Sequence, residues 1–238
     1  MPDRCSLHVD TLTMRFPIEE REHTVFEDFE LCLDAEGFTV LLGRSGCGKT
    51  TLLRLLSGLI APTAGQIHKP AGIRMGMMFQ EARLLPWLSC EKNVTLGLKK
   101  PDMEKVREIL KLVGLEGFAG AYPDQLSGGM QQRAALARTL IRDSNLILMD
   151  EPFAALDAFT RQNMQKELLR IRKESGCGVI LVTHNIDEAL LLADRIVLLP
   201  SGGGELRDYE LPVQNGERDI LTEPYIGIKK EIQALMRG

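Results

Sequence analysis

Long hydrophobic runs, paired cysteines and an excess of basic charge are all missing from this 238-residue sequence. No stretch of about 18 uncharged apolar residues is present, so we expect no membrane-spanning segment, and the first ten residues lack the apolar core of a secretory signal. The five cysteines are scattered without a C-x-x-C pair, which favours reduced thiols in a cytosol over a disulfide framework or a zinc site. With 29 Lys and Arg against 33 Asp and Glu, nucleic acid is not expected as a main partner.

The sequence does contain near-continuous apolar runs that alternate with helical patterns. Hydrophobic residues make up 44% of the chain, enough for one substantial core with room for a subdomain. Runs of this kind fit central strands of a parallel sheet covered on both faces, and the alternation with helices predicts an α/β domain. The runs are FTVLLG, MGMMFQ, NLILMD, GVILVTH and RIVLLP.

The remaining segments follow other patterns. Apolar residues alternate in LTMRF and FELCLD, which predicts two antiparallel strands, and the acidic PIEEREH between them predicts an exposed hairpin loop. The segment from Phe79 to Asn145 is mostly helical and predicts a helical subdomain. After Pro200, SGGGE predicts a loop, and a short helix near 226–236 ends the tail.

The ends of two helices can be read from the sequence. Asp102 and Asp157 are expected as N-caps, and the helices they begin are expected to stop at Gly114 and Gly176. The helix that begins at Asp102 is expected to bury Met103, Val106, Leu110 and Val113, and the helix that begins at Asp157 to bury Met164, Leu168 and Ile171. The helix in TLLRLLSGL is expected to bury Leu52, Leu55, Leu56 and Leu59.

Residues 43–51, GRSGCGKTT, fit the spacing G-x-x-x-x-G-K-[ST] between a predicted strand and a predicted helix. The glycines let backbone N–H groups close around phosphate oxygens, and the helix points its positive end at them. Lys49 can reach the β- and γ-phosphates, the Thr50 hydroxyl can bind Mg²⁺, and Thr51 adds a hydroxyl near the α-phosphate. The candidate nucleotide-binding residues are Gly43, Arg44, Ser45, Gly46, Cys47, Gly48, Lys49, Thr50 and Thr51.

Two acidic residues follow the apolar run in LILMDEPF. Asp150 is expected to hold Mg²⁺ through water, and Glu151 to orient or deprotonate the attacking water. An acidic pair after a strand is more often a loop or a helix cap. The phosphate-binding loop in the same chain favours the catalytic interpretation.

The stretch LSGGMQQRAALARTLIR contains a second helix start that can bind an anion, formed by Ser127, Gly128 and Gly129. The phosphates of one nucleotide cannot easily occupy both this site and residues 43–51 within one monomer. The serine site could instead face the nucleotide of another copy. An N-cap serine followed by a flexible turn is the alternative.

The chain resembles the ATP-binding subunits of ABC transporters from Phe16 to about Leu199. The matching elements, in the family's order, are GRSGCGKTT, the Gln80 of MMFQ, LSGGM, LILMDEP, AALD ending at Asp157, and the His184 of VTHNIDEAL. The resemblance implies a single ABC ATPase domain over 1–238. Its parts would be an N-terminal antiparallel β subdomain, a P-loop NTPase core with a parallel sheet (1–80 and 145–200), a helical subdomain (about 81–144) and a tail (about 201–238).

The resemblance also implies that two copies pack head to tail around two ATP molecules. Residues 43–51 of one copy and Ser127, Gly128 and Gly129 of the other would hold each ATP, and Asp157 would help to align the dimer. A helix N-cap is an additional role that Asp157 can fill at the same time.

Three further roles follow from the family pattern. Phe16 would stack on adenine, Gln80 would contact Mg²⁺ and the attacking water, and His184 would contact the γ-phosphate and hold Glu151 in place. The alternatives are an ordinary core phenylalanine for Phe16 and a structural or surface position for His184.

Three positions depart from the commonest family pattern. Met130 replaces a glutamine, Ala154 stands where serine is frequent, and Cys47 is unusual inside its loop. The first two changes remove no phosphate contact and no catalytic group. The small size of cysteine is the simple explanation for Cys47, and a second hypothesis is that its oxidation blocks the nucleotide, because a bulkier group would fill the phosphate cradle.

The stretches MMFQEARLLPWLSCEKNVTLGL and EPFAALDAFTR resemble importer ATPases of the nitrate, sulfonate and taurine group. The resemblance implies a peripheral protein at the cytoplasmic face of the membrane, with a second ATPase subunit, an integral permease and a substrate-binding protein as partners. The segment Arg83 to Leu98 would form much of the groove for the permease. Trp87 would lie in or near this groove, with plain packing as the alternative.

A non-transport ATPase and a nucleotide sensor are the alternatives to an importer. A soluble ABC-type assembly scaffold is disfavoured by the importer-like sequence after Gln80, and a nucleotide sensor without useful hydrolysis is disfavoured by the presence of Glu151 and His184. DNA-repair ATPases insert long coiled coils between the two phosphate-binding stretches. Here Lys49 and Ser127 are about 78 positions apart, with no heptads.

Overall fold

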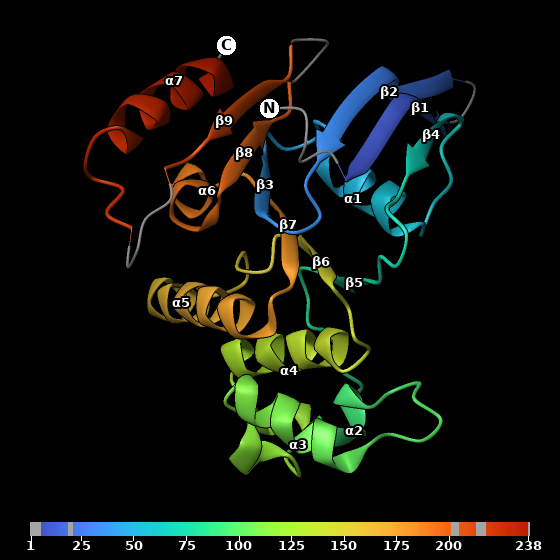
Figure 1. Cartoon of the computed structure of the whole chain (residues 1–238), viewed down its shortest axis with the longest axis vertical. Coiled ribbons are helices and arrows are strands. Elements are labelled where there is room, and N and C mark those ends of the chain that lie inside the picture. The colour runs from blue at the N-terminus through green and yellow to red at the C-terminus, as the bar shows by residue number, and fades with distance from the viewer. Residues whose placement is uncertain (1–5, 19–20, 201–204, 213–217, 238) are drawn as a thin grey trace. The chain divides into compact units, whose positions relative to one another are not determined.

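The computed structural model describes residues 6–18, 21–200, 205–212 and 218–237 (Figure 1). The contacts divide the chain into two compact units, one formed by the described residues up to Ile73 and from Gly178 onward, the other by residues 74–177. The first unit is discontinuous in sequence. Strand pairing joins its two segments, because β3 (Phe38–Leu42) pairs with both β7 (Gly178–Thr183) and β8 (Arg195–Leu198).

An antiparallel sheet opens the first unit, as the alternating pattern predicted. It contains β1 (Leu7–Ile18), β2 (Arg21–Leu33) and β4 (Ala64–His68) in the order β2-β1-β4. The alternating residues Leu12, Met14 and Leu31 are buried.

The expected hairpin loop PIEEREH is wrong at both ends. Pro17 pairs with Glu22 and Ile18 with Arg21, so the strands run further than their apolar alternation. A ladder of backbone hydrogen bonds continues into solvent when one face is polar, and the charged side chains there do not interrupt it. Glu19 and Glu20 lie outside the described residues.

Four strands of the first unit lie side by side in the order β7-β3-β8-β9, with β9 at Arg207–Glu210. The first three are parallel and β9 is antiparallel. Every residue of β3 and β7 is buried, which confirms the interpretation of FTVLLG and GVILVTH as central strands. Three helices accompany them: α1 (Lys49–Ser57), α6 (Ile186–Leu192) and α7 (Tyr225–Arg237). The α7 helix confirms the predicted helix of the tail, and it packs on α6.

The second unit is mostly helical. Its two strands, β5 (Met75–Met78) and β6 (Leu146–Asp150), are parallel and adjacent. The α4 helix (Gly128–Leu140) contacts β5 and the other three helices, so it lies at the centre of this unit. Those helices are α2 (Cys90–Val94), α3 (Met103–Leu112) and α5 (Ala158–Ser175), and two 3₁₀ turns lie at Glu116–Phe118 and Pro123–Gln125.

The predicted helix ends are confirmed. The Asp102 carboxylate accepts hydrogen bonds from the N–H groups of Glu104 and Lys105, and α5 ends at Gly176, whose φ is 69°. The predicted apolar faces are wrong at Met103, which is 39% exposed in the first turn of α3, and at Leu59, which follows the end of α1 and is 56% exposed. Both residues follow the 3.6-residue spacing of the apolar positions, but they lie at helix ends, where no element of the described structure covers them.

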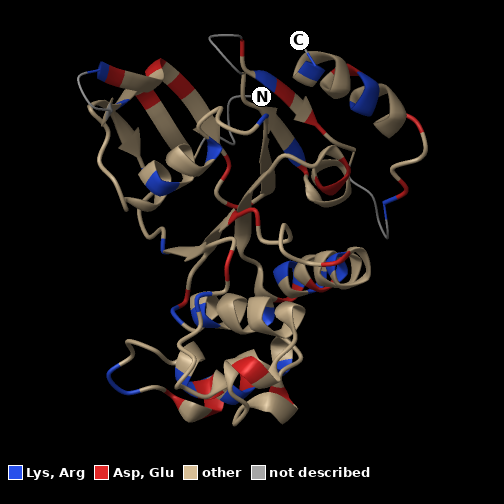
Figure 2. Cartoon of the chain, turned by 180° about the vertical axis from the view of Figure 1, so that it is seen from behind, with Lys and Arg blue, Asp and Glu red and all other residues tan. Residues whose placement is uncertain are grey.

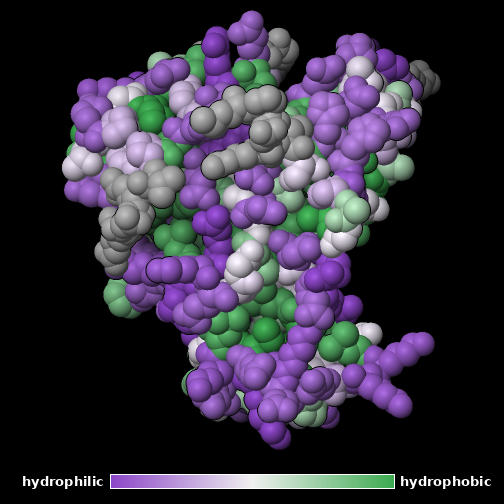
Figure 3. All heavy atoms as spheres, in the orientation of Figure 1, coloured by the Kyte–Doolittle hydropathy of each residue, from purple (hydrophilic) through white to green (hydrophobic). Residues whose placement is uncertain are grey.

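Charges of both signs are interspersed on α3 and α5 (Figure 2). Hydrophilic residues cover most of the face drawn in Figure 3, with smaller hydrophobic patches between them. Among the described helices, none combines the length and the apolar content that a bilayer crossing requires.

The cysteines differ in part from expectation. Cys47, Cys90 and Cys177 are free, whereas Cys32 is disulfide-bonded, so the prediction of reduced thiols is wrong for Cys32. Spacing along the chain does not show which cysteines folding brings together. Cys32 lies in β2, where strand pairing sets its neighbours.

Candidate nucleotide-binding site

The glycine-rich loop lies between β3 and α1, where the sequence placed it. Two glycines have the left-handed backbone that most residues avoid, with φ of 85° at Gly46 and 95° at Gly48. The N–H of Leu52 donates to the oxygen of Gly48 at 2.8 Å, which begins the helix. The N–H groups before Leu52 have no place in the intrahelical ladder, and they make this helix start suited to an anion.

Gly48 is required for its size as well as its backbone. A Cβ built there would lie 2.7 Å from Cζ of Phe26 and 2.8 Å from Cγ1 of Val25, so any side chain would collide with β2. A Cβ at Gly46 would meet no atom within 4 Å. The loop is therefore packed on one side and open on the other.

The Lys49 side chain bonds back to the glycine-rich loop that precedes it. Its Nζ donates to the carbonyl oxygens of Gly43 and Arg44, both at 2.8 Å, and lies 3.8 Å from Sγ of Cys47. The lysine is only 5% exposed. Both carbonyl acceptors are uncharged, so an anion bound in the loop would supply the opposite charge that a buried ammonium favours.

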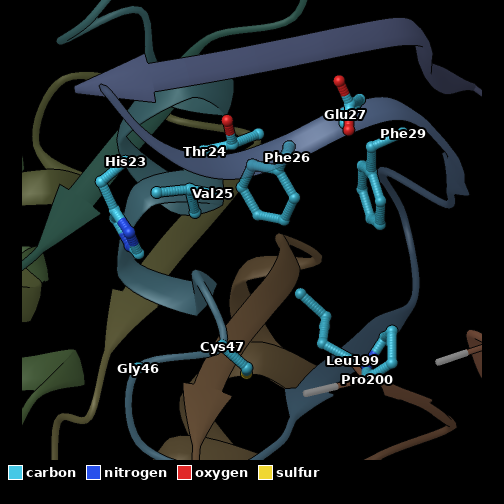
Figure 4. Close-up of a pocket in the computed structure, with 10 residues that line it drawn as sticks. All are labelled: His23, Thr24, Val25, Phe26, Glu27, Phe29, Gly46, Cys47, Leu199 and Pro200. Atoms are coloured by element: carbon cyan, nitrogen blue, oxygen red, sulfur yellow. The ribbon is translucent and has the colours of Figure 1, made fainter. Parts of the chain in front are cut away.

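A cavity of about 620 Å³ adjoins this loop (Figure 4). In Figure 4, β2 passes above Gly46 and Cys47, and the rings of Phe26 and Phe29 extend from it toward the side of Leu199. The two ring centroids are 4.7 Å apart. The lining residues are His23, Thr24, Val25, Phe26, Glu27, Phe29, Gly46, Cys47, Leu199 and Pro200.

Phe16 lies one strand away from this cavity. It pairs with His23 in the β1–β2 ladder, and His23 lines the cavity together with Gly46 and Cys47. Directly paired residues of antiparallel strands present their side chains on the same face. The half-buried Phe16 is therefore near residues 46–47, although about 30 positions separate them in the sequence.

Strand pairing also places His184 beside the glycine-rich loop. The last pair between β3 and β7 is Leu42 with Thr183, and the next residues along the two strands are Gly43 and His184. The turn at His184 is held by the Thr183 hydroxyl, which donates to the Glu188 carboxylate at 2.7 Å. His184 itself is exposed.

In the second unit, the acidic pair lies at the end of β6. Asp150 is its last residue and is 9% exposed. Glu151 follows with φ of 44°, a left-handed conformation that costs free energy for a residue with a side chain. The N–H of Ala154 donates to the carbonyl of Glu151 at 3.1 Å and closes the turn. Strain of this kind is frequent at functional sites.

Ser127 is the N-cap of α4, and its Oγ accepts the N–H of Met130 at 3.3 Å. Ser127 and Gly128 are exposed and Gly129 is buried. A Cβ on Gly129 would lie 2.9 Å from Cγ2 of Thr160, so glycine lets α4 approach the start of α5 closely. The N-cap role that was an alternative for Ser127 is present, and it leaves the helix start exposed to a partner.

Asp157 is the N-cap of α5, as its spacing predicted. Its carboxylate accepts the N–H groups of Phe159 and Thr160, both at 3.0 Å. The pKa of Asp157 is held below its usual value. The main cause is the hydrogen bond from the Thr160 side chain, and the backbone hydrogen bonds from Thr160 and Phe159 add to it.

The candidate residues are divided between the two units. Phe16, residues 43–51 and His184 belong to the first, where Gly46 and Cys47 of the loop line the cavity. Gln80, Ser127, Gly128, Gly129, Asp150, Glu151 and Asp157 belong to the second. Sequence reasoning missed the contribution of β2, because only strand pairing brings Val25 and Phe26 to the loop and no spacing motif marks them.

A glycine-rich loop between a buried parallel strand and a helix, closed by a buried lysine, defines a P-loop nucleotide-binding protein. Residues 26–154 match the protein family described as ABC transporter. This match covers more than half of the chain, and the chain belongs to the ABC transporter family as one of its ATP-binding ATPases.

Relatives match over nearly the whole chain. A taurine import ATP-binding protein from Roseobacter denitrificans is 41% identical over 94% of this chain and 91% of its own length. An aliphatic sulfonates import ATP-binding protein from Bacillus cereus is 38% identical over 98% of this chain and 97% of its own length. Among solved structures, a dimeric ATP-binding cassette in a post-hydrolysis state with ADP and Pi has a TM-score of 0.73 and 30% identity, covering 87% of this chain and 100% of its own.

Proposed function

We propose that this protein is the ATP-hydrolysing subunit of an importer, and that it powers uptake of a small solute of the nitrate, sulfonate or taurine class. The observation that carries the proposal is the similarity to import ATP-binding proteins over nearly the full length, together with a phosphate loop that its own lysine closes. The reaction is ATP plus water to ADP and phosphate.

The first unit holds the nucleotide. The N–H groups at the start of α1 and the Lys49 ammonium bind the β- and γ-phosphates, and Thr51 lies near the α-phosphate. Phe16 stacks on the adenine, next to the cavity that Val25 and Phe26 line. The open side of Gly46, where a Cβ would meet nothing within 4 Å, leaves room for phosphate oxygens.

Mg²⁺ fits this donor set. Hydroxyl, amide and carboxylate oxygens are ligands of the kind that Mg²⁺ takes beside phosphate oxygens and water. Thr50, Gln80 and Asp150 are the protein groups that would hold the ion, directly or through water. Bound there, it would neutralise charge that develops on the phosphates.

Glu151 is the group that orients the attacking water and accepts its proton. The turn that follows β6 fixes its backbone, so the carboxylate starts from a defined position. His184 contacts the γ-phosphate and steadies Glu151. Positioning and charge stabilisation supply most of the rate enhancement in phosphoryl transfer.

A second copy completes each site. The exposed start of α4, at Ser127, Gly128 and Gly129, binds the triphosphate held by the loop of the other subunit, and Asp157 aligns the two. Within one chain, the start of α1 and the start of α4 are separate helix N-termini, and each is suited to an anion.

The partners are a second ATPase subunit, an integral permease and a substrate-binding protein that acts through the permease, with the protein peripheral at the cytoplasmic face of the membrane. Segment 81–144 forms the helical subdomain that meets the permease. Trp87 is 69% exposed within this segment, so its side chain is accessible to a partner.

Purification from membranes in mild detergent tests this proposal. A hydrophobic permease is expected to co-purify, and addition of the substrate-binding protein with its solute is expected to stimulate ATP hydrolysis. Recovery with soluble partners alone would favour an assembly scaffold and contradict the importer.

A further inference from the structure

The loop that follows β5 is fixed to α4 by side chains rather than by its own backbone. Nε2 of Gln132, on α4, donates to the carbonyl oxygen of Gln80 at 2.8 Å. Gln132 is 4% exposed, so water competes little for this bond. The Gln80 side chain itself is exposed, while its backbone is anchored.

A second side chain of α4 holds the next residues of the same loop. Nη2 of Arg138 donates to the carbonyl of Ala82 at 2.7 Å, and Nη1 donates to the carbonyl of Arg83 at 2.9 Å. Burial, aided by the neighbouring Arg142, lowers the pKa of Arg138. A guanidinium is the one side chain whose planar fork can reach two successive carbonyl groups with two parallel donors.

The loop also has strained and stacked features that need such an anchor. Arg83 has φ of 49°, and its guanidinium carbon lies 3.9 Å from the centroid of the Phe79 ring. A left-handed residue with a long side chain persists only where its surroundings hold it. The bonds to Gln132 and Arg138 supply that support.

Gln132 is an unexpected residue for a buried position unless this bond matters. Its Oε1 is buried and has no hydrogen-bond partner among the described residues, and an unsatisfied buried acceptor destabilises the fold. A methionine would fill the same space without that cost. What the glutamine adds is the donor to Gln80.

We propose that Gln132 and Arg138 are positioning residues that couple the Gln80 loop to the helix whose start carries Ser127. The inference rests on the proposed roles of Gln80 and Ser127. One rigid helix then joins the residue that contacts the attacking water to the residues that meet the partner's ATP.

The first test compares ATP hydrolysis and ATP affinity in Gln132→Met, Arg138→Met and the control Arg133→Met, each in the assembled transporter. Arg133 lies on the same helix and also donates to two successive carbonyls, those of Val113 and Gly114, at 3.0 and 3.3 Å. We expect kcat to fall about tenfold in the first two variants, with the Kd for ATP changed less than about twofold. Arg133→Met is expected to retain kcat, and an equal loss in all three would overturn the proposal.

A double-mutant cycle separates positioning from general stability. If Gln132 acts through Gln80, then Gln80→Ala with Gln132→Met is expected to be no slower than Gln80→Ala alone. Losses that multiply would show that Gln132 acts independently of Gln80, which contradicts the inference and leaves the ATPase assignment intact.

Hydrogen exchange provides a readout that does not need hydrolysis. Amides of residues 81–84 are expected to exchange faster in Gln132→Met and Arg138→Met, and at the unaltered rate in Arg133→Met. Unchanged exchange in all variants would overturn the anchoring itself. Failure of the proposed function would appear differently, as an unaltered protein that hydrolyses no ATP while its loop exchange still responds to Gln132→Met.

Discussion

The loop at 43–48 and the loop at 80–83 are positioned in opposite ways. The first depends on two left-handed glycines and on a lysine that bonds to carbonyls of its own loop. The second has a left-handed arginine, and donors from a separate helix hold its carbonyls. The loop at 43–48 is held by its own residues and is expected to keep one shape. The loop at 80–83 is held by α4 and is expected to move with that helix.

The two units therefore contribute different groups to the proposed site. The first unit supplies a preformed site for phosphate, since its geometry needs nothing from outside the loop and β2. The second supplies groups whose positions depend on α4 and on the turn after β6. We therefore expect substitutions in the loop at 43–51 to change nucleotide affinity, and substitutions at Gln80 and Glu151 to change turnover. His184 belongs to the first unit but is expected to act on turnover through Glu151.

The largest effect is expected from Glu151→Gln, in the second unit. Loss of the carboxylate removes the acceptor for the proton of water, so kcat is expected to fall by about a thousandfold while ATP binding persists. Single-turnover hydrolysis and equilibrium ATP binding measure the two quantities. Glu108→Gln, at an exposed position of α3, is the control, and a Glu151→Gln variant with the unaltered rate would show that another group acts as the base.

Lys49→Ala is expected to weaken ATP binding, in contrast to Glu151→Gln, which lowers kcat. The variant removes a charged donor from the phosphate cradle, so the Kd for ATP is expected to rise about 10- to 100-fold. Fluorescent nucleotide titration measures the change, with the exposed Lys69→Ala as a control for the loss of one positive charge. Unchanged affinity with reduced kcat alone would break the proposed division between the units.

Trp87→Ala tests the coupling surface of the second unit. Solute uptake by the reconstituted transporter is expected to fall several-fold, while basal ATP hydrolysis by the isolated subunit is retained, because the side chain is exposed and carries no group that takes part in phosphoryl transfer. Leu221→Ala is a matched control, since Leu221 is 75% exposed in the tail. Equal uptake in both variants would support a plain surface role for Trp87.

The smallest and most local effect concerns Cys47. An alkylating reagent is expected to block ATP binding when it labels Cys47, and bound ATP is expected to slow the labelling, because the thiol lines the cavity beside Gly46. Cys90 is buried, and burial followed by the nearby Glu91 raises the pKa of its thiol, which lowers its reactivity. Full labelling of Cys47 without loss of activity would contradict the hypothesis, and Cys47→Ala is expected to be insensitive.

The sequence predicted the buried strands well because parallel central strands are apolar on both faces. It missed β4 and β9, whose residues are mostly exposed, so no hydrophobic run marks them. These two strands are defined by backbone pairing with a neighbouring strand. Tyr209 of β9 lies opposite Ile196, and the adjacent pair of β9 and β8 residues, Asp208 and Val197, continues the ladder.

The same contrast holds for the candidate site. Motif spacing predicts residues 43–51 and 127–129 as candidate site residues, because backbone geometry there depends on neighbours in sequence. It could not find Val25, Phe26 or Gln132, which reach the site through strand pairing and helix packing. The position of His184 beside Gly43 likewise follows from the register of two strands.

The most direct measurement is a structure of the Glu151→Gln variant with ATP and Mg²⁺. We expect a dimer in which each triphosphate contacts residues 43–51 of one subunit and Ser127 of the partner subunit. A single subunit that encloses the triphosphate, with its own Ser127 and Gly128 exposed to solvent and facing no nucleotide, would contradict the central claim that two copies share each site.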